Sequence, residues 1–119
     1  MIAKKYRFHG HSSLRWVFSK GKTYRSRRFL MRRSQNPKRK LPRVAVVVSK
    51  KVHKSAVVRN RIRRRVFEIV RREWSVLPAG SDIAITVYSV DVADISHDEI
   101  MQELTNLLHE MAADNSSRL

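Results

Sequence analysis

The first half of this 119-residue sequence lacks acidic residues. All ten aspartates and glutamates lie at Glu68 or later, whereas 23 of the 26 lysines and arginines lie at or before Arg65. Residues 1–67 therefore carry a formal charge of +23, and residues 68–119, with three basic and ten acidic side chains, carry −7. A segment this positive repels itself unless a polyanion neutralises it. Nucleic acid is the obvious polyanion, and an anionic membrane surface is the weaker alternative.

Cysteine and long apolar runs are also missing. The absence of cysteine excludes disulfides and thiolate metal sites, and it fits a reducing cytosol. No apolar run approaches the roughly 18 residues of a membrane span. The N-terminal sequence MIAKKYRFHGHSS has no apolar segment of a secretory signal. We therefore expect a cytoplasmic protein without membrane contact, folded as a single domain over 1–119, with flexible ends at about 1–8 and 113–119.

The first half of the chain shows weak strand and helix signals. Its pattern predicts a short helix over 11–21, an extended segment over 22–34 and a turn over 35–42. The β-branched run RVAVVVS at 43–49 has no alternation of apolar and polar residues. Such a run predicts a central strand that is covered on both faces.

The second half shows clearer periodicity. A helix is expected over 55–74, with one apolar stripe made by Val58, Ile62, Val66, Ile69 and Val70. Residues 82–90 alternate as a strand, and residues 96–111 have the spacing of a helix that begins at a capping box of Ser96 and Glu99. The expected fold class is α+β, a single-domain sandwich of helices on a small sheet.

An ordinary enzyme site is hard to find. The three glycines form no phosphate-binding loop, and no nucleophile stands at a suggestive spacing from a base. Asp91, Asp94 and Asp98 cluster near a helix start, where acids usually interact with the helix dipole. His9 and His11 have the spacing of a metal pair but no evident third ligand, so we expect them to be exposed or in contact with RNA.

The stretch SKKVHKSAVVRNRIRRRVFEIVRRE at 49–73 holds ten basic residues around the apolar stripe. A solvated basic face is the usual explanation of such a run. Here no acid precedes Glu68, and arginine, whose planar fork binds phosphate through two hydrogen bonds, dominates over lysine. This composition favours a phosphate-binding helix. Upstream, Trp16 could stack on single-stranded bases, whereas Phe18 fits the core as well as a base contact.

This stretch resembles the signature of the bacterial ribonuclease P protein family. The signature consists of SKK, a short spacer and then an R-N-R helix, which here reads AVVRNRIRRRVFE. The segment LRWVFSKG at 14–21 is similar to the first-helix pattern of the family. The resemblance extends over roughly residues 6–112. The sequence departs from the family at Leu14, which replaces an aromatic residue, near Arg32, where an aromatic is common, and in the spacer VHKS, which lacks the usual glycine.

The resemblance implies a fold and a function. The fold has the order α-β-β-β-α-β-α, with the basic helix in a left-handed β-α-β crossover. The family protein is the accessory subunit of an endoribonuclease whose RNA is the catalyst, and it helps to remove the 5′ leader from precursor tRNA. The chain would act as a monomer and hold no cofactor itself, while magnesium would be held mainly by the RNA.

The resemblance also assigns residues. The contacts with the catalytic RNA fall on Lys50, Lys51, Arg59, Asn60, Arg61, Arg63, Arg64 and Arg65. The contacts with the single-stranded leader fall on a cleft that includes Leu14, Trp16, Phe18, Arg32 and Arg43. No catalytic or metal-binding residue is expected.

Two other functions remain open from the sequence. Composition alone fits a ribosomal protein or an RNA chaperone equally well, and only the R-N-R signature and the first-helix pattern separate these from the family above. A DNA-binding module is a third candidate. Against it, the helix carries only Asn60 among the usual base-reading side chains, and no dimerisation surface is apparent. We therefore expect RNA rather than DNA as the partner.

Overall fold

The computed structural model of the protein describes residues 21–35 and 41–117. These ranges contain the strands β1 (Lys22–Arg25), β2 (Phe29–Gln35), β3 (Arg43–Val48) and β4 (Ser81–Val87). They also contain the helices α2 (Ala56–Arg72) and α3 (His97–Ser117) and the short 3₁₀ turns η2 (Trp74–Val76) and η3 (Val90–Ala93). The described residues do not include the N-terminal residues 1–8, the histidines at 9 and 11, or the predicted helix over 11–21 except its last residue, Gly21.

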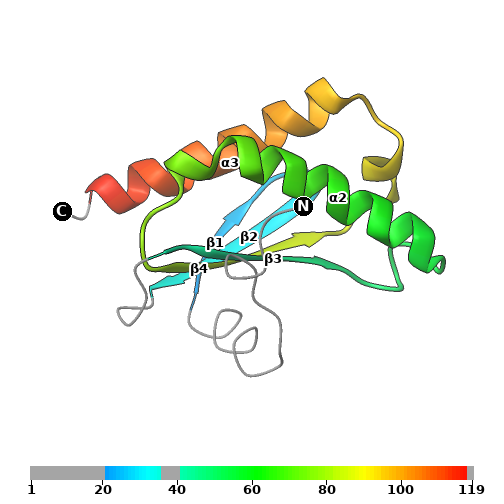
Figure 1. Cartoon of the computed structure of the whole chain (residues 1–119), viewed down its shortest axis with the longest axis horizontal. Coiled ribbons are helices and arrows are strands. Elements are labelled where there is room, and N and C mark those ends of the chain that lie inside the picture. Colours follow the sequence, from blue (N-terminus) through cyan, green and yellow to red (C-terminus); the bar gives the residue numbers. More distant parts are fainter. Residues whose placement is uncertain (1–20, 36–40, 118–119) are drawn as a thin grey trace.

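The molecule is built in layers, with α2 and α3 side by side over one face of the sheet (Figure 1). The strands lie in the order β1-β2-β4-β3. β4 pairs antiparallel with β2 and parallel with β3, so α2 is the connection of a β-α-β unit. The α+β sandwich and the order of the described elements are confirmed. The left-handed crossover stays a prediction from the resemblance.

The sequence predicts that β3 is a central strand, and this prediction is wrong. Among the described strands it lies at one edge of the sheet, and the central positions belong to β2 and β4. Four of its six residues are nevertheless buried, including Val44 and Ala45, which point to opposite faces. A continuous apolar run therefore reports that both faces of a strand are covered. It does not report how many neighbouring strands there are.

The predicted apolar stripe of α2 forms the centre of the core. Ile62, Val66, Ile69 and Val70 are fully buried, together with β4 residues such as Ile83 and Ile85. The helix begins after Ser55, whose Oγ accepts a hydrogen bond from the amide of Val58 at 3.4 Å, as an N-cap does. Because the apolar stripe occupies one side of α2, the arginines of this helix lie on its remaining sides.

The extended segment predicted at 22–34 is a hairpin of β1 and β2. The chain reverses at Ser26, whose amide donates to the carbonyl of Phe29 at 2.9 Å. Its tip is held by Arg28, which donates to Asp91 Oδ2 at 3.0 Å and to Glu103 Oε1 at 2.9 Å, while Glu99 lies 3.7 Å away. The acids of the C-terminal half therefore neutralise part of the basic half within the fold.

The last helix is longer than predicted. α3 begins after Ser96, whose Oγ accepts from the amide of Glu99 at 3.2 Å, so this half of the expected capping box is present. The helix continues to Ser117, six residues beyond the predicted end at 111. Near its end Asp114 accepts a hydrogen bond from the hydroxyl of Tyr24 at 2.6 Å and pairs with Lys22. These contacts tie the end of α3 to β1.

The free energy of unfolding at acidic pH is expected to depend on the ionisation of Asp91. The hydroxyl of Ser89 and the guanidinium of Arg28 lower the pKa of Asp91 below its ordinary value. A lowered pKa in the folded state adds stability above the ordinary pKa, and this stability is lost as the pH falls through the folded value. The free energy of unfolding in urea should therefore drop between about pH 5 and pH 2, and Asp91→Asn should reduce that drop. An unchanged pH profile in the variant would contradict this role.

Candidate nucleic-acid interface

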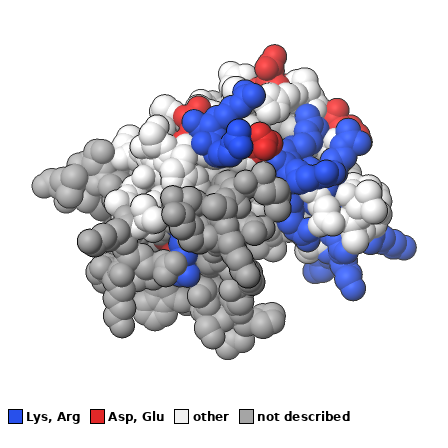
Figure 2. Space-filling view, viewed as in Figure 1, with Lys and Arg blue, Asp and Glu red and all other residues white. Residues whose placement is uncertain are grey.

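A basic surface follows α2 in the described part of the chain. Lysine and arginine side chains gather over this helix and around its N-terminal end (Figure 2). Asn60, Arg61 and Arg64 are exposed, whereas Arg59, Arg63 and Arg65 are partly buried. Arg63 donates to the amide oxygen of Asn60, which positions both side chains along the helix. The predicted residues of the R-N-R segment are thus brought together on one element.

The two predicted lysines extend this surface. Lys50 and Lys51 are exposed in the turn that leads from β3 into α2. The turn is fixed by His53, whose Nδ1 accepts from the amide of Ser55 at 3.0 Å, and by a bond from the amide of Val52 to the carbonyl of Ser49 at 3.1 Å. The lysines therefore project from an ordered connection at the start of the arginine helix.

Arg65 is used within the fold. Its two terminal nitrogens donate to the carbonyls of Val92 at 2.9 Å and Ile95 at 2.6 Å. These carbonyls belong to η3 and to the segment that leads into α3. Arg65 thereby fastens the beginning of α3 to α2, and it acts on the surface chiefly as a positioning residue.

Loss of the Arg65 guanidinium should destabilise this junction. Arg65→Ala leaves two partly buried carbonyls without these donors, which should lower the free energy of unfolding by about 1–3 kcal/mol. Arg65→Lys should recover little, because one ammonium group replaces a fork that reaches two carbonyls. Arg64→Ala, which removes an exposed side chain of the same type, should leave stability within about 0.5 kcal/mol. Urea denaturation followed by circular dichroism measures all three, and equal effects of Arg65→Ala and Arg64→Ala would disprove the assignment.

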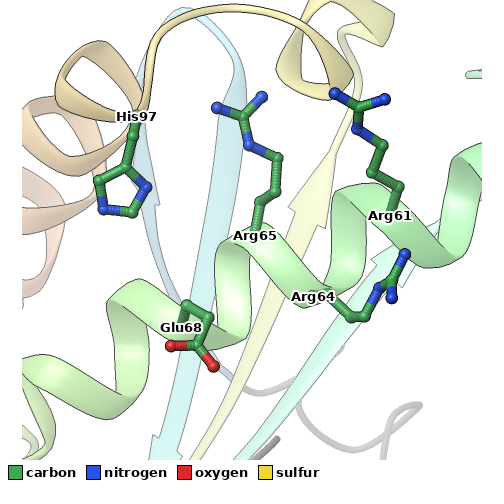
Figure 3. Close-up of a pocket in the computed structure, with 5 residues that line it drawn as sticks. All are labelled: Arg61, Arg64, Arg65, Glu68 and His97. Carbon is green, nitrogen blue, oxygen red and sulfur yellow. The ribbon is translucent and has the colours of Figure 1, made fainter.

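Where α2 passes the start of α3, the surface is hollowed. The hollow has a volume of about 400 Å³ and is lined by Arg61, Arg64, Arg65, Glu68 and His97 (Figure 3). The four residues from α2 follow the spacing i, i+3, i+4 and i+7, which places them on one face of the helix. Sequence reasoning found the arginines but missed Glu68 and His97. The helical spacing could have revealed Glu68, whereas His97 arrives from a distant element with no local signal.

The predicted leader-binding residues are only partly described. Leu14, Trp16 and Phe18 lie outside the described residues, whereas Arg32 and Arg43 lie on β2 and β3. The strand register places both arginines on the face of the sheet opposite α2 and α3. Arg43 is held there by two hydrogen bonds of 2.9 Å to the carboxylate of Asp82. The predicted RNA-binding residues of α2 and the described leader-binding residues Arg32 and Arg43 therefore lie on two separate surfaces of the protein.

Neither a metal centre nor a membrane span was found in the described ranges 21–35 and 41–117. No three histidine or acidic side chains there are grouped to hold a metal ion. None of the helices in this part of the chain is both long and apolar enough to cross a membrane.

Comparison with known proteins identifies the family. A family model described as Ribonuclease P matches residues 2–112. The chain belongs to this family. Ribonuclease P protein components from Cyanothece and Bacillus cereus are similar to it. The Cyanothece protein is 32% identical over an alignment that covers 92% of this chain and 95% of the relative. The Bacillus cereus protein is 28% identical over an alignment that covers 89% of this chain and 90% of the relative.

Solved structures of ribonuclease P proteins share the fold. The protein from Staphylococcus aureus is 25% identical, with a TM-score of 0.76, over 87% of this chain and 92% of its own. The protein from Thermotoga maritima is 27% identical, with a TM-score of 0.73, over 82% and 89%. The family resemblance drawn from SKK and the R-N-R helix is thus confirmed. Membership places the chain in the context of a ribonucleoprotein that processes tRNA and has ribonuclease P RNA as a partner.

Proposed function

We propose that this chain is the accessory protein subunit of a ribonuclease P ribonucleoprotein, which removes the 5′ leader of precursor tRNA. The RNA carries out the chemistry, and the protein binds it through the arginine face of α2. The observation that carries this proposal is the set of exposed, adjacent Asn60, Arg61 and Arg64, continued by Lys50 and Lys51 at the start of the same helix.

The mechanism is electrostatic and positional. The stripe of α2 is packed on the sheet, so the arginines are presented by a rigid element and little conformational entropy is lost when phosphates bind. Each phosphate neutralised releases counterions, which makes assembly strongly dependent on salt. Magnesium is held mainly by the RNA, and the positive protein lowers the magnesium concentration required for folding and cleavage.

The leader of the substrate belongs on the sheet surface opposite the helices. Arg32 and Arg43 lie there, and Asp82 fixes the guanidinium of Arg43 in a defined direction. Phe18 and Trp16 of the first helix would complete this cleft. Two opposite surfaces of one domain would then contact the catalytic RNA and the substrate.

The test is cleavage of precursor tRNA by a bacterial ribonuclease P RNA at low magnesium, with and without the protein. Substrates with a long leader and with a one-nucleotide leader are compared. We expect the protein to restore cleavage at the mature 5′ end, more strongly for the long leader. Equal rescue of both substrates would keep the subunit role and refute the leader cleft. Absence of rescue with several such RNAs would refute the subunit role and favour the ribosomal or chaperone function.

A further inference from the structure

The hollow between α2 and the start of α3 contains an acid at a place where a polyanion should bind. Glu68 lies one helical turn beyond Arg64, a spacing at which opposite charges can pair, although a base that precedes its acid, as here, is the weaker order. Yet within the described part of the chain neither the carboxylate of Glu68 nor the guanidinium of Arg64 makes a hydrogen bond or an ion pair. Simple electrostatics predicts that Glu68 weakens RNA binding.

The other groups around the hollow also lack full pairing. Nε2 of His97 is shielded from solvent and has no hydrogen-bond partner among the described residues. Among the acids of residues 21–35 and 41–117, Arg61 approaches only Asp94, at 4.0 Å, and the two side chains are 58% and 81% exposed. Arg65 by contrast is already bound to two carbonyls. The hollow thus presents the guanidinium groups of Arg61 and Arg64, the carboxylate of Glu68 and the imidazole of His97. The fixed guanidinium of Arg65 forms part of its wall.

The size and chemistry of the hollow fit one nucleotide. Its volume of about 400 Å³ lies within the range of about 300–1,000 Å³ that is typical of ligand sites. The arginines can bind a phosphate, whereas a carboxylate can only accept hydrogen bonds and therefore requires a donor. In a nucleic acid backbone the donor nearest the phosphate is the ribose 2′-hydroxyl, which DNA lacks.

We infer that this hollow holds one ribonucleotide of the partner RNA, with its phosphate on Arg61 and Arg64 and its 2′-hydroxyl donating to Glu68. His97 forms the wall beside the ribose. Glu68 then distinguishes RNA from DNA, because without the hydroxyl its carboxylate faces a phosphate-rich strand with no donor. This inference rests on the proposed function and adds to it a residue that selects the chemical class of the backbone.

Two substitutions near Arg61 test whether Glu68 binds a hydroxyl group of the RNA or only repels its phosphates. Glu68→Ala removes an acid from inside the hollow, and Asp94→Ala removes an exposed acid beside Arg61. Both raise the positive charge by one, and alanine favours the helix at position 68. The affinity of each protein for a transcribed bacterial ribonuclease P RNA is measured at one fixed salt concentration, after circular dichroism has confirmed the fold.

We expect Glu68→Ala to weaken RNA binding about tenfold, since a hydrogen bond to a charged group is lost, while Asp94→Ala leaves it unchanged or tightens it. Binding is then repeated with the same RNA carrying sparse 2′-deoxynucleotides. We expect one nucleotide at which the 2′-deoxy substitution weakens binding by the unmodified protein and by Asp94→Ala. At the same nucleotide the substitution should have no effect on binding by Glu68→Ala.

The opposite results overturn the inference. Tighter binding by Glu68→Ala, comparable to that of Asp94→Ala, would make Glu68 a merely repulsive acid. An identical deoxynucleotide pattern for both variants would likewise exclude a hydroxyl contact. In either case the unmodified protein still binds the RNA, and the proposed function stands. Failure of the unmodified protein to bind any ribonuclease P RNA would overturn the inference and the proposed function together.

Discussion

Replacement of Arg61 and Arg64 by alanine should weaken assembly with the catalytic RNA at least about 100-fold. Both side chains are exposed on the same face of α2, and each phosphate contact of a charged group is worth about 1.5–3 kcal/mol. The slope of log affinity against log salt should also fall by about 2, because two fewer counterions are displaced. Filter binding over a salt series measures both quantities.

The matched control is Arg71→Ala with Arg72→Ala. These arginines are also exposed, they lie on the last turn of the same helix, and their loss changes the net charge by the same amount. We expect their affinity loss to stay below about tenfold, as for general electrostatic attraction. Equal losses in the two double variants would show that net charge, and not the face at Arg61, determines binding. Normal assembly of the first variant would refute the interface.

The second large effect concerns stability. Arg28→Ala should lower the free energy of unfolding by about 3 kcal/mol, because removing one partner of a shielded ion pair leaves the other charge uncompensated. The side chains of Arg28 and Glu103 are only 12% and 14% exposed, and Asp91 also loses its cationic partner while it keeps the hydrogen bond from Ser89. The two carboxylates raise the pKa of Arg28, Asp91 more than Glu103, so the guanidinium stays charged at every pH of interest.

Arg27→Ala serves as the control for this prediction. Arg27 neighbours Arg28 but is exposed, so its loss should change stability by no more than about 0.5 kcal/mol. Adding Glu103→Gln to Arg28→Ala should recover part of the loss, since the buried negative charge is then removed as well. Urea unfolding of the four proteins provides the comparison. A stability of Arg28→Ala equal to that of Arg27→Ala would show that the ion pair contributes nothing.

Local pattern predicted α2 well. The expected helix at 55–74 corresponds to α2 at Ala56–Arg72, and four residues of its predicted stripe are fully buried. The strand expected at 82–90 ends earlier, at Val87, because the chain turns into η3. These elements are set by side-chain spacing, which the sequence displays directly.

Contacts between distant segments were not accessible in this way. The pairing of Arg28 with Asp91 spans 63 positions, and Asp91 was instead expected to act on a helix dipole. Asp98 does lie in the first turn of α3, as that expectation requires. The edge position of β3 and the meeting of His97 with the arginines also depend on the order of strands and helices in space. Charge and spacing constrain each element but do not determine which elements become neighbours.

The pairing of β2 with β4 has a consequence for how the protein is made. Phe29 lies opposite Val87, so β2 acquires its central neighbour only after the ribosome has added more than half of the chain. The carboxylates that neutralise Arg28, Glu99 and Glu103 among them, are synthesised later still. Until then the emerging polypeptide carries a formal charge of up to +24 beside ribosomal RNA, because residues 1–72 hold 25 basic side chains and one acid. The arginine helix therefore becomes a selective surface only near the end of translation, when β4 and α3 complete the fold beneath it.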